Sequence, residues 1–306
     1  MISDSGKNII IRIIGQIIEK TRKVSMPGFQ KVPVYDVGMF FFKGLWQGSI
    51  TTRASSIAFN FFLALFPAIM FFFTMIPFVS DINFQSKILA LLCDVMPRNA
   101  YETLRETLED IVTNQRGSLL SFGFFAALYF STSGISSMIE AFNTSYHETE
   151  TRTWISQRLI SLYLVLILTL LITTAIILIV FSEVATNYLV KIHVLKDGWT
   201  FFLLYSGKWL IIIALFFFAI SFLYYLAPVK KEKWRFISAG STLSTLLTIV
   251  TSTGFSYYIN NFGQYNKLYG SIGTILVILL WLYFNAIVLL MGFELNVSIR
   301  NAKFRK

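Results

Sequence analysis

The chain alternates long hydrophobic blocks with short polar connections. The blocks cover about residues 57–79, 119–139, 159–182, 209–229, 236–258 and 271–293, and the first contains no Asp, Glu, Lys or Arg. At about 1.5 Å per residue, a helix over each block crosses the ~30 Å hydrocarbon layer of a bilayer. A membrane strand would instead show about ten residues of alternating polarity, and no block does. The pattern predicts an all-α, polytopic integral membrane protein with six transmembrane helices.

The segments outside these blocks complete the predicted domain organisation. Residues 1–32 form an amphipathic N-terminal segment, in which "NIIIRIIGQIIEKTRK" places isoleucines on one helical face and charged residues on the other. Such a helix either rests in the membrane interface or packs against the bundle. The six-helix transmembrane domain covers residues 33–300, with a helical extracytoplasmic insertion at 80–116 that acts as a small cap, and residues 301–306 form a basic tail.

Charge sets the predicted orientation of the chain. Charged residues make up only 14% of the sequence, yet the formal net charge is +10. When alternate connections are assigned to one side of the membrane, that side, with both termini, carries eighteen Lys and Arg against eight on the other. This asymmetry predicts cytoplasmic N and C termini. The basic cluster at residues 230–235 is then an orientation signal and a contact for anionic lipid headgroups, and we expect no nucleic-acid partner.

Polar residues inside the fifth block form a regular ridge. Ser or Thr occupies ten of the nineteen positions from 238 to 256, and Gly240, Ser244, Thr248 and Ser252 repeat every four residues. Small residues at this spacing allow a tight helix crossing, whereas their hydroxyls could instead line a polar cavity. The sequence leaves both interpretations open.

Further polar side chains gather near the predicted cytoplasmic ends of the other spans. Arg53 stands at the entrance of span 1, so a cluster with a carboxylate at the same level, Glu140 or Glu294, is geometrically possible. The sequence does not show which carboxylate pairs with Arg53. The candidate residues for a substrate-binding or polar cavity are Arg53, Asn60, Ser133, Ser137, Glu140, Ser244, Thr248, Ser252, Asn285, Glu294 and Asn296. The alternative for the Ser and Thr residues of span 5 and the polar residues of the last span is helix packing through interhelical hydrogen bonds, and the alternative for Glu140 is that it simply reaches the membrane interface.

Catalytic chemistry finds little support in the sequence. A metal-dependent nuclease needs several His, Asp or Glu ligands around one ion, but the two histidines, His147 and His193, fall on opposite predicted sides of the membrane. The single cysteine, Cys93, excludes a cysteine cage, and no glycine-rich phosphate loop or nucleophile elbow is present. We therefore expect no catalytic residues, no metal site, no cofactor and no enzymatic activity.

Four stretches carry a resemblance to a known family. They are "RASSIAFNFFLALFPAIMFF", "LYFSTSGISSMIEAFNTSY", "YYLAPVKKEKWRFISAGS" and "YNKLYGSIGTILVILLWLYFNAIVLLMGFELN". In order and spacing they resemble the signature blocks of the YihY/BrkB family of bacterial inner-membrane proteins, over roughly residues 40–300. Phe293 departs from the pattern, because the family usually has Ala there. The resemblance implies six transmembrane helices and a multi-pass protein of the bacterial inner membrane.

The resemblance implies the fold more firmly than the activity, because members of that family carry different functional labels. Older labels include ribonuclease BN and a serum-resistance virulence factor, and a related branch is linked to export of lipopolysaccharide or its lipid precursor. The chain has too few candidate metal ligands for a metal-dependent nuclease, so we reject the ribonuclease label. We expect a transporter or flippase of a lipid or envelope precursor, with membrane lipids, above all anionic headgroups, as partners. The alternative is a non-catalytic membrane organiser or envelope assembly factor, and a homo-oligomer is open in either case.

Overall fold

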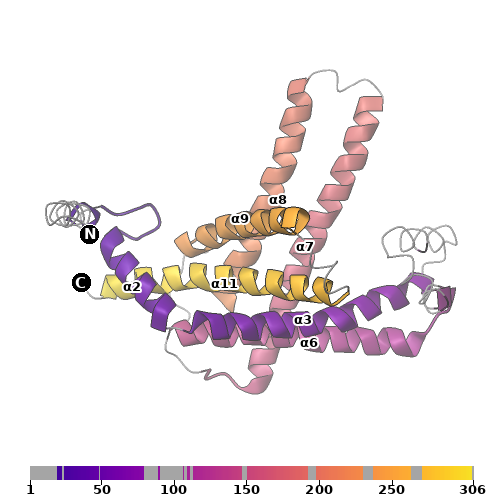
Figure 1. Ribbon diagram of the computed structural model, residues 1–306, viewed down its shortest axis with the longest axis horizontal. Coiled ribbons are helices and arrows are strands. Elements are labelled where there is room, and N and C mark those ends of the chain that lie inside the picture. Colours follow the sequence, from indigo (N-terminus) through magenta and orange to yellow (C-terminus); the bar gives the residue numbers. More distant parts are fainter. Residues whose placement is uncertain are drawn as a thin grey trace. The chain divides into compact units, whose positions relative to one another are not determined.

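Every regular element in the described part of the chain is helical. The computed structural model describes residues 19–22, 24–47, 49–78, 89, 106, 109–110, 113–146, 150–191, 198–229, 237–262 and 271–304. Most of the predicted N-terminal amphipathic helix, most of the extracytoplasmic insertion and the basic cluster at 230–235 lie outside these residues, as do both histidines. The helices confirm an all-α, polytopic membrane fold (Figure 1).

The helix boundaries follow the hydrophobic blocks and extend beyond them. The elements are α2 (Val34–Gln47), α3 (Ile50–Met75), η1 (Ile76–Phe78), α6 (Gly117–Ser145), α7 (Trp154–Lys191), α8 (Gly198–Leu226), α9 (Ala239–Phe262) and α11 (Ser271–Phe304). Pro67 lies inside α3, while Pro77 falls in the 3-10 turn after it. α8 ends just before Pro228, which lacks the N–H that a continuing helix needs. α11 runs on through residues 301–304, the start of the expected tail.

Five of the described helices are long and apolar enough to cross a membrane: α3 with η1, α6, α7, α8 and α11. They match five of the six predicted spans. The remaining predicted span, 236–258, forms helix α9 in the expected place, but α9 is not among these five. Its many hydroxyls are the reason, because they lower the hydrophobicity of a segment whose length would suffice.

The chain divides into two compact units. Ala58–Gly134 form one unit, and Met1–Ile57 with Ile135–Lys306 form the other. In the smaller unit α3 and α6 approach closely, since a Cβ atom on Gly123 would lie 3.1 Å from the Cα of Phe71. The rings of Phe71 and Phe124 lie beside each other there, with centroids 5.6 Å apart.

In the larger unit, α11 is the central helix. α9 runs along it, α2 packs against it, and α7 and α8 form a hairpin that meets α9 through α8 (Figure 1). The contact between α2 and the last turns of α11 is apolar, with Val37 buried against Ile299 and Ala302. This packing holds α2 across the end of α11 and so positions the residues described below.

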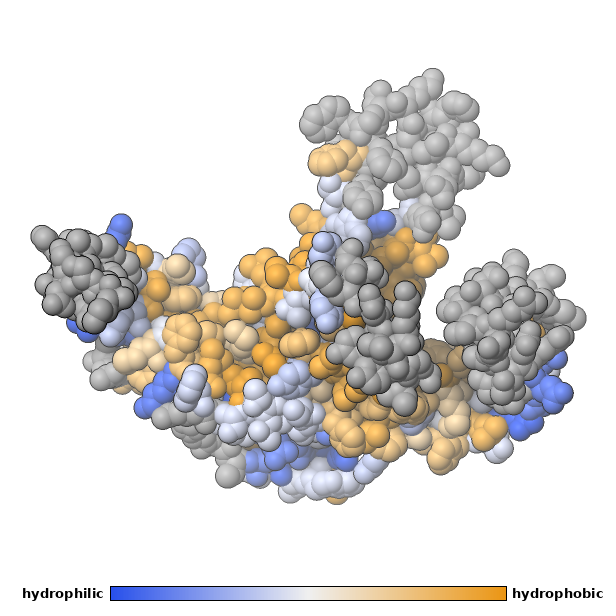
Figure 2. Space-filling view, in the orientation of Figure 1, coloured by the Kyte–Doolittle hydropathy of each residue, from blue (hydrophilic) through white to orange (hydrophobic). Residues whose placement is uncertain are grey.

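Hydrophobic side chains cover much of the described surface (Figure 2). α7 is the clearest case, because Leu170, Ile177 and Phe181 are all well exposed. Hydrophilic residues gather in separate groups instead of forming a continuous coat. Exposed apolar helices suit a hydrocarbon solvent, in which burying such side chains gains little.

Candidate functional site: a buried arginine–glutamate pair

Arg53 lies in the first turn of α3 and reaches the C-terminal end of α6. Its Nη1 donates hydrogen bonds to the carbonyl oxygen of Ala141, at 2.7 Å, and to Oγ of Ser145, at 2.6 Å. A cation is favoured at this place because the carbonyl end of a helix carries partial negative charge. Only 10% of the Arg53 side chain is exposed, so the guanidinium is almost entirely removed from solvent.

Glu294 on α11 is the carboxylate that pairs with Arg53. Oε2 of Glu294 lies 3.9 Å from Nη2 of Arg53, and 7% of the Glu294 side chain is exposed. The separation exceeds that of a hydrogen bond, so the attraction is one of charge alone. Glu140, the other carboxylate considered for this pairing, is exposed on α6. The structure therefore answers the question that the sequence left open.

The Arg53 guanidinium is only partly hydrogen-bonded. Within the described residues, its Nε and Nη2 atoms are buried and make no hydrogen bond. These two atoms form one edge of the planar fork with which arginine binds carboxylates and phosphates in a bidentate manner. Buried charges are normally satisfied by several hydrogen bonds, so an open edge in this position is unusual.

Helix α2 passes directly over the pair at Gly44. A Cβ atom added to Gly44 would overlap the carboxylate of Glu294. Only glycine lets the α2 backbone approach this closely. The pair is thus enclosed by α2, α3, α6 and α11, all through residues of the larger unit.

An aromatic cluster adjoins the pair on α11. The ring of Phe293 stacks on Phe142 at 4.2 Å between centroids and meets Tyr146 and Tyr224 edge-on, at 5.5 and 5.4 Å. The guanidinium of Arg300 lies over the Tyr146 ring, 4.7 Å from its centroid. Phe293, where the resembled family usually has Ala, is fully buried and fills the centre of this cluster.

One turn further along, α9 crosses α11 at very short range. Oδ1 of Asn296 accepts a hydrogen bond from the backbone N–H of Gly240 at 2.8 Å, and its Nδ2 donates to Oγ of Ser238 at 2.9 Å. A side chain on Gly240 or Gly292 would overlap the opposite helix. At these positions the polar and small residues serve the helix crossing.

Tyr224 of α8 joins this crossing through its hydroxyl. The hydroxyl donates to the carbonyl of Leu289 at 2.6 Å and lies 2.5 Å from Oγ of Ser244, which itself donates to the carbonyl of Val288 at 3.0 Å. We call Tyr224, Ser244 and Asn296 with their partners the α8–α9–α11 junction. Tyr224 was not a candidate from the sequence, although it stands near the end of an apolar block and is the first residue of one of the family-like stretches.

The remaining candidate residues differ from one another in burial and in hydrogen bonding. Thr248 is buried and its hydroxyl has no hydrogen-bond partner among the described residues, while Ser137, Ser252 and Asn285 are partly exposed. Nδ2 of Asn285 donates to the carbonyl of Trp281 in its own helix at 2.8 Å. Asn60 and Ser133 belong to the smaller unit.

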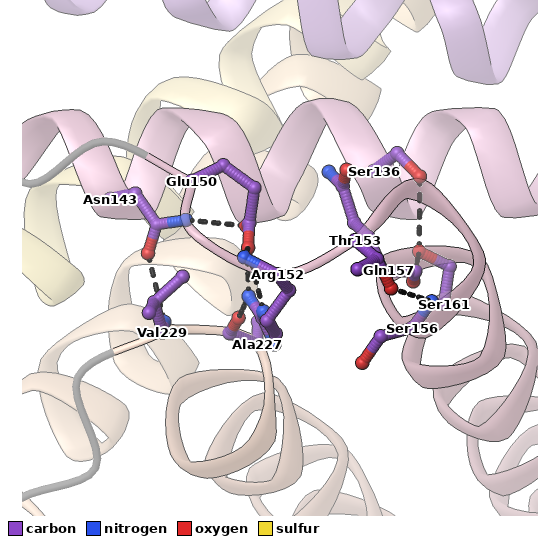
Figure 3. A network of polar contacts seen from close by, with 10 residues as sticks. All are labelled: Ser136, Asn143, Glu150, Arg152, Thr153, Ser156, Gln157, Ser161, Ala227 and Val229. Carbon is purple, nitrogen blue, oxygen red and sulfur yellow. Dashed lines mark hydrogen bonds and ion pairs between the residues drawn. The ribbon is translucent and has the colours of Figure 1, made fainter.

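A second polar network joins the end of α6 to the end of α8 (Figure 3). Nδ2 of Asn143 donates to Oε2 of Glu150 at 2.9 Å, while its Oδ1 accepts from the N–H of Val229, also at 2.9 Å. Arg152 pairs with both oxygens of Glu150, at 2.8 and 3.0 Å, and Nη2 of Arg152 donates to the carbonyl of Ala227 at 2.8 Å. This network fixes the connection between α6 and α7 against the segment that follows α8.

The charge state of Glu150 reflects this network. Burial by itself raises the pKa of the Glu150 carboxyl, but the hydrogen bonds from Arg152 and Asn143 outweigh that effect and hold the pKa below its usual range. Hydrogen bonds to the charged form produce such a decrease. None of these residues was a candidate from the sequence, although Asn143 stands in one of the family-like stretches.

Metal ligands do not converge in the described part of the chain. No group of three His, Cys, Asp or Glu side chains lies close enough there to hold an ion. The Arg53–Glu294 pair offers charge recognition and hydrogen bonding.

Comparison with known proteins gives a family match over most of the chain. The family described as "Virulence factor BrkB" matches residues 41–306. The ribonuclease-like protein YfkH of Bacillus subtilis is 29% identical over 259 residues, which cover 82% of this chain and 90% of YfkH. A UPF0761 membrane protein of Alteromonas mediterranea is 26% identical over 87% of this chain and 88% of its own length. A UPF0761 membrane protein of Idiomarina loihiensis is 25% identical over 71% of this chain and 73% of its own length. No solved structure matches the chain.

Proposed function

Since this chain belongs to the virulence factor BrkB family of membrane proteins, we propose that it transports or flips an anionic lipid or envelope precursor across the bacterial inner membrane. In this proposal both termini are cytoplasmic, as the charge asymmetry of the sequence indicates. The Arg53–Glu294 pair is then the place where the negatively charged headgroup is recognised.

The open edge of Arg53 is the observation that carries the proposal. Two buried N–H groups of one guanidinium edge, Nε and Nη2, make no hydrogen bond within the described residues. That edge matches the geometry of two phosphate oxygens. If Arg53 served only helix packing, both of these N–H groups would be expected to make hydrogen bonds. A buried donor of a charged group that makes no hydrogen bond destabilises the fold.

The location of the pair supports transport over a purely structural role. Both residues belong to helices that can span the membrane, α3 and α11. Charged residues in such helices are expensive to insert and commonly mark the path of a substrate. A well-packed apolar pair would stabilise the bundle at least as well as a buried ion pair.

The experiment is a translocation assay in proteoliposomes. A fluorescent phosphatidylglycerol and a matched phosphatidylcholine are placed in one leaflet, and their arrival in the other is followed by quenching. We expect the wild-type protein to move the anionic lipid faster than protein-free vesicles, with little effect on the zwitterionic one. The double variant Arg53→Gln, Glu294→Gln keeps the site neutral and should fold but lose this activity.

Two results would contradict the proposal. The first is an absence of translocation for every lipid tested, with protein that is folded and correctly inserted. The second is a double variant that remains fully active. Either would favour the non-catalytic organiser, especially if cross-linking then found a stoichiometric protein partner.

A further inference from the structure

We propose that Glu294 is an exchangeable counter-ion: an incoming anionic headgroup takes its place on Arg53, and Glu294 binds one proton from water as it is displaced. This inference rests on the proposed function and adds its driving force, because each anion bound is then accompanied by one proton. Arg53 remains protonated throughout.

Competition for one guanidinium edge is the first step of the argument. Nη1 of Arg53 is committed to α6 through Ala141 and Ser145, so only the Nε–Nη2 edge can accept a ligand. Oε2 of Glu294 lies 3.9 Å from Nη2, one of the two nitrogens of that edge, which exceeds hydrogen-bond distance. A phosphate bound to both Nε and Nη2 would also use Nη2, and so would compete there with the carboxylate of Glu294.

Charge balance is the second step. With Arg53 and Glu294 both ionised, the buried pair is neutral. Adding a monoanionic phosphate would leave a net negative charge in surroundings where both side chains are nine-tenths or more buried. Uncompensated charge in such surroundings is strongly disfavoured, and a carboxylate beside a second anion responds by binding a proton. Proton uptake by Glu294 restores neutrality.

Glu294 is the carboxylate that lies beside the Arg53 guanidinium, so it is the group expected to titrate in this exchange. Besides Glu294, the charged or titratable side chains on the helices that meet at the pair are Tyr35, Asp36 and Lys43 on α2, Arg53 on α3, Tyr129 and Glu140 on α6, Tyr146 after α6, and Tyr283, Arg300 and Lys303 on α11. α9, which packs along α11, has no charged side chain. Lysine, arginine and tyrosine do not change charge near neutral pH. Glu140 is an exposed carboxylate and so provides a matched control.

The test measures proton uptake on binding to the full-length protein in detergent micelles. The probe is dihexanoyl phosphatidylglycerol, and titration calorimetry is run at pH 6, 7 and 8 in two buffers of different ionisation enthalpy. We expect close to one proton bound per probe at pH 8. Where Glu294 is ionised in the free protein, Kd should rise by about tenfold per pH unit, as uptake of one proton requires.

Two variants sharpen the test. Glu294→Gln should bind the probe without proton uptake and with a Kd independent of pH, whereas Glu140→Gln should behave as the wild type. Thermal unfolding of each variant checks that it is folded. If Glu294→Gln does not fold, the proton uptake of the wild-type protein decides the matter by itself.

Each unfavourable outcome has a distinct meaning. Binding with no proton uptake, or a pH slope retained in Glu294→Gln, overturns the counter-ion exchange. Lipid translocation observed together with that result would leave the proposed function standing. No binding of the probe at any pH overturns the exchange, and a failed translocation assay in addition overturns the proposed function.

Discussion

Two polar regions lie next to each other along α11 and differ in how completely their groups are hydrogen-bonded. In the α8–α9–α11 junction the groups are neutral, and the hydroxyls of Tyr224 and Ser244 and the amide of Asn296 all have partners on another helix. In the Arg53–Glu294 pair the groups are charged, the ion pair is 3.9 Å long, and one guanidinium edge is open within the described residues.

The difference separates two uses of polarity in a membrane protein. A saturated neutral network fixes one arrangement of helices and has no capacity left for a ligand. A buried charge with unused donors is costly to the fold and retains the capacity to bind. Polar residues within hydrophobic blocks therefore cannot be assigned to a site by composition alone. What distinguishes a binding site from helix packing is whether the polar groups have donors or acceptors left without a hydrogen bond.

The largest expected effect is the loss of one partner of the charged pair. Arg53→Gln leaves Glu294 buried without its counter-charge, and we expect a destabilisation of about 3–5 kcal/mol. The double variant Arg53→Gln, Glu294→Gln removes both charges and should recover most of that loss. Thermal unfolding in detergent measures both. A double variant no more stable than the single one would show that the charges are not coupled.

The second-largest loss of stability is expected from a substitution that adds a side chain to a glycine in the α8–α9–α11 junction. Gly292→Ala places a methyl group against Ser244 and the backbone carbonyl of Gly240. Overpacking of this kind costs about 1–3 kcal/mol. Gly254→Ala, in α9, is the matched control because nothing lies within 4 Å of its added Cβ. Equal unfolding temperatures for the two variants would argue against the close crossing.

Removing a single hydroxyl from the junction should have a smaller effect. Tyr224→Phe deletes the hydrogen bonds to Ser244 and to the carbonyl of Leu289. Interhelical hydrogen bonds in membranes contribute about 0.6 kcal/mol on average and up to about 1.7. We expect a loss in this range with unchanged affinity for the phosphatidylglycerol probe. A large decrease in that affinity would join the junction to the binding site and weaken the comparison.

The smallest effect on stability is expected from a substitution in the polar network of Asn143, Glu150 and Arg152, where Glu150 lies outside the membrane spans. Because the pKa of Glu150 is lowered in the folded protein, its contribution to stability is present above the usual pKa of glutamate, roughly 4.3. That contribution is lost as the pH falls through the lowered value. Glu150→Gln should therefore unfold at a lower temperature than the wild type at pH 7, and the difference should shrink at pH 3. A difference as large at pH 3 as at pH 7 would exclude the carboxylate charge as its cause.

Much of the fold could be predicted from hydrophobic patterning, because a helix in hydrocarbon must be apolar over some twenty residues. α9 shows the limit of that rule, since its residues Ser241, Ser244, Thr245 and Thr248 are buried and need not face lipid, although Thr242, Thr253 and Ser256 are exposed. The candidate site was predictable only as a set of polar positions. Arg53, Glu294 and Asn296 were all named, yet nothing in the spacing along separate helices could show that Glu294 meets Arg53 while Asn296 meets Gly240.

By itself the sequence determined that this is an all-helical membrane protein, which family it resembles, and which few polar residues its hydrophobic segments contain. These properties are local, since each depends on the composition and order of residues within one segment. Only the tertiary structure decided which polar groups meet. Partnership depends on the rotation and depth of each helix relative to its neighbours, and these are set by packing between segments as distant in sequence as Arg53 and Glu294.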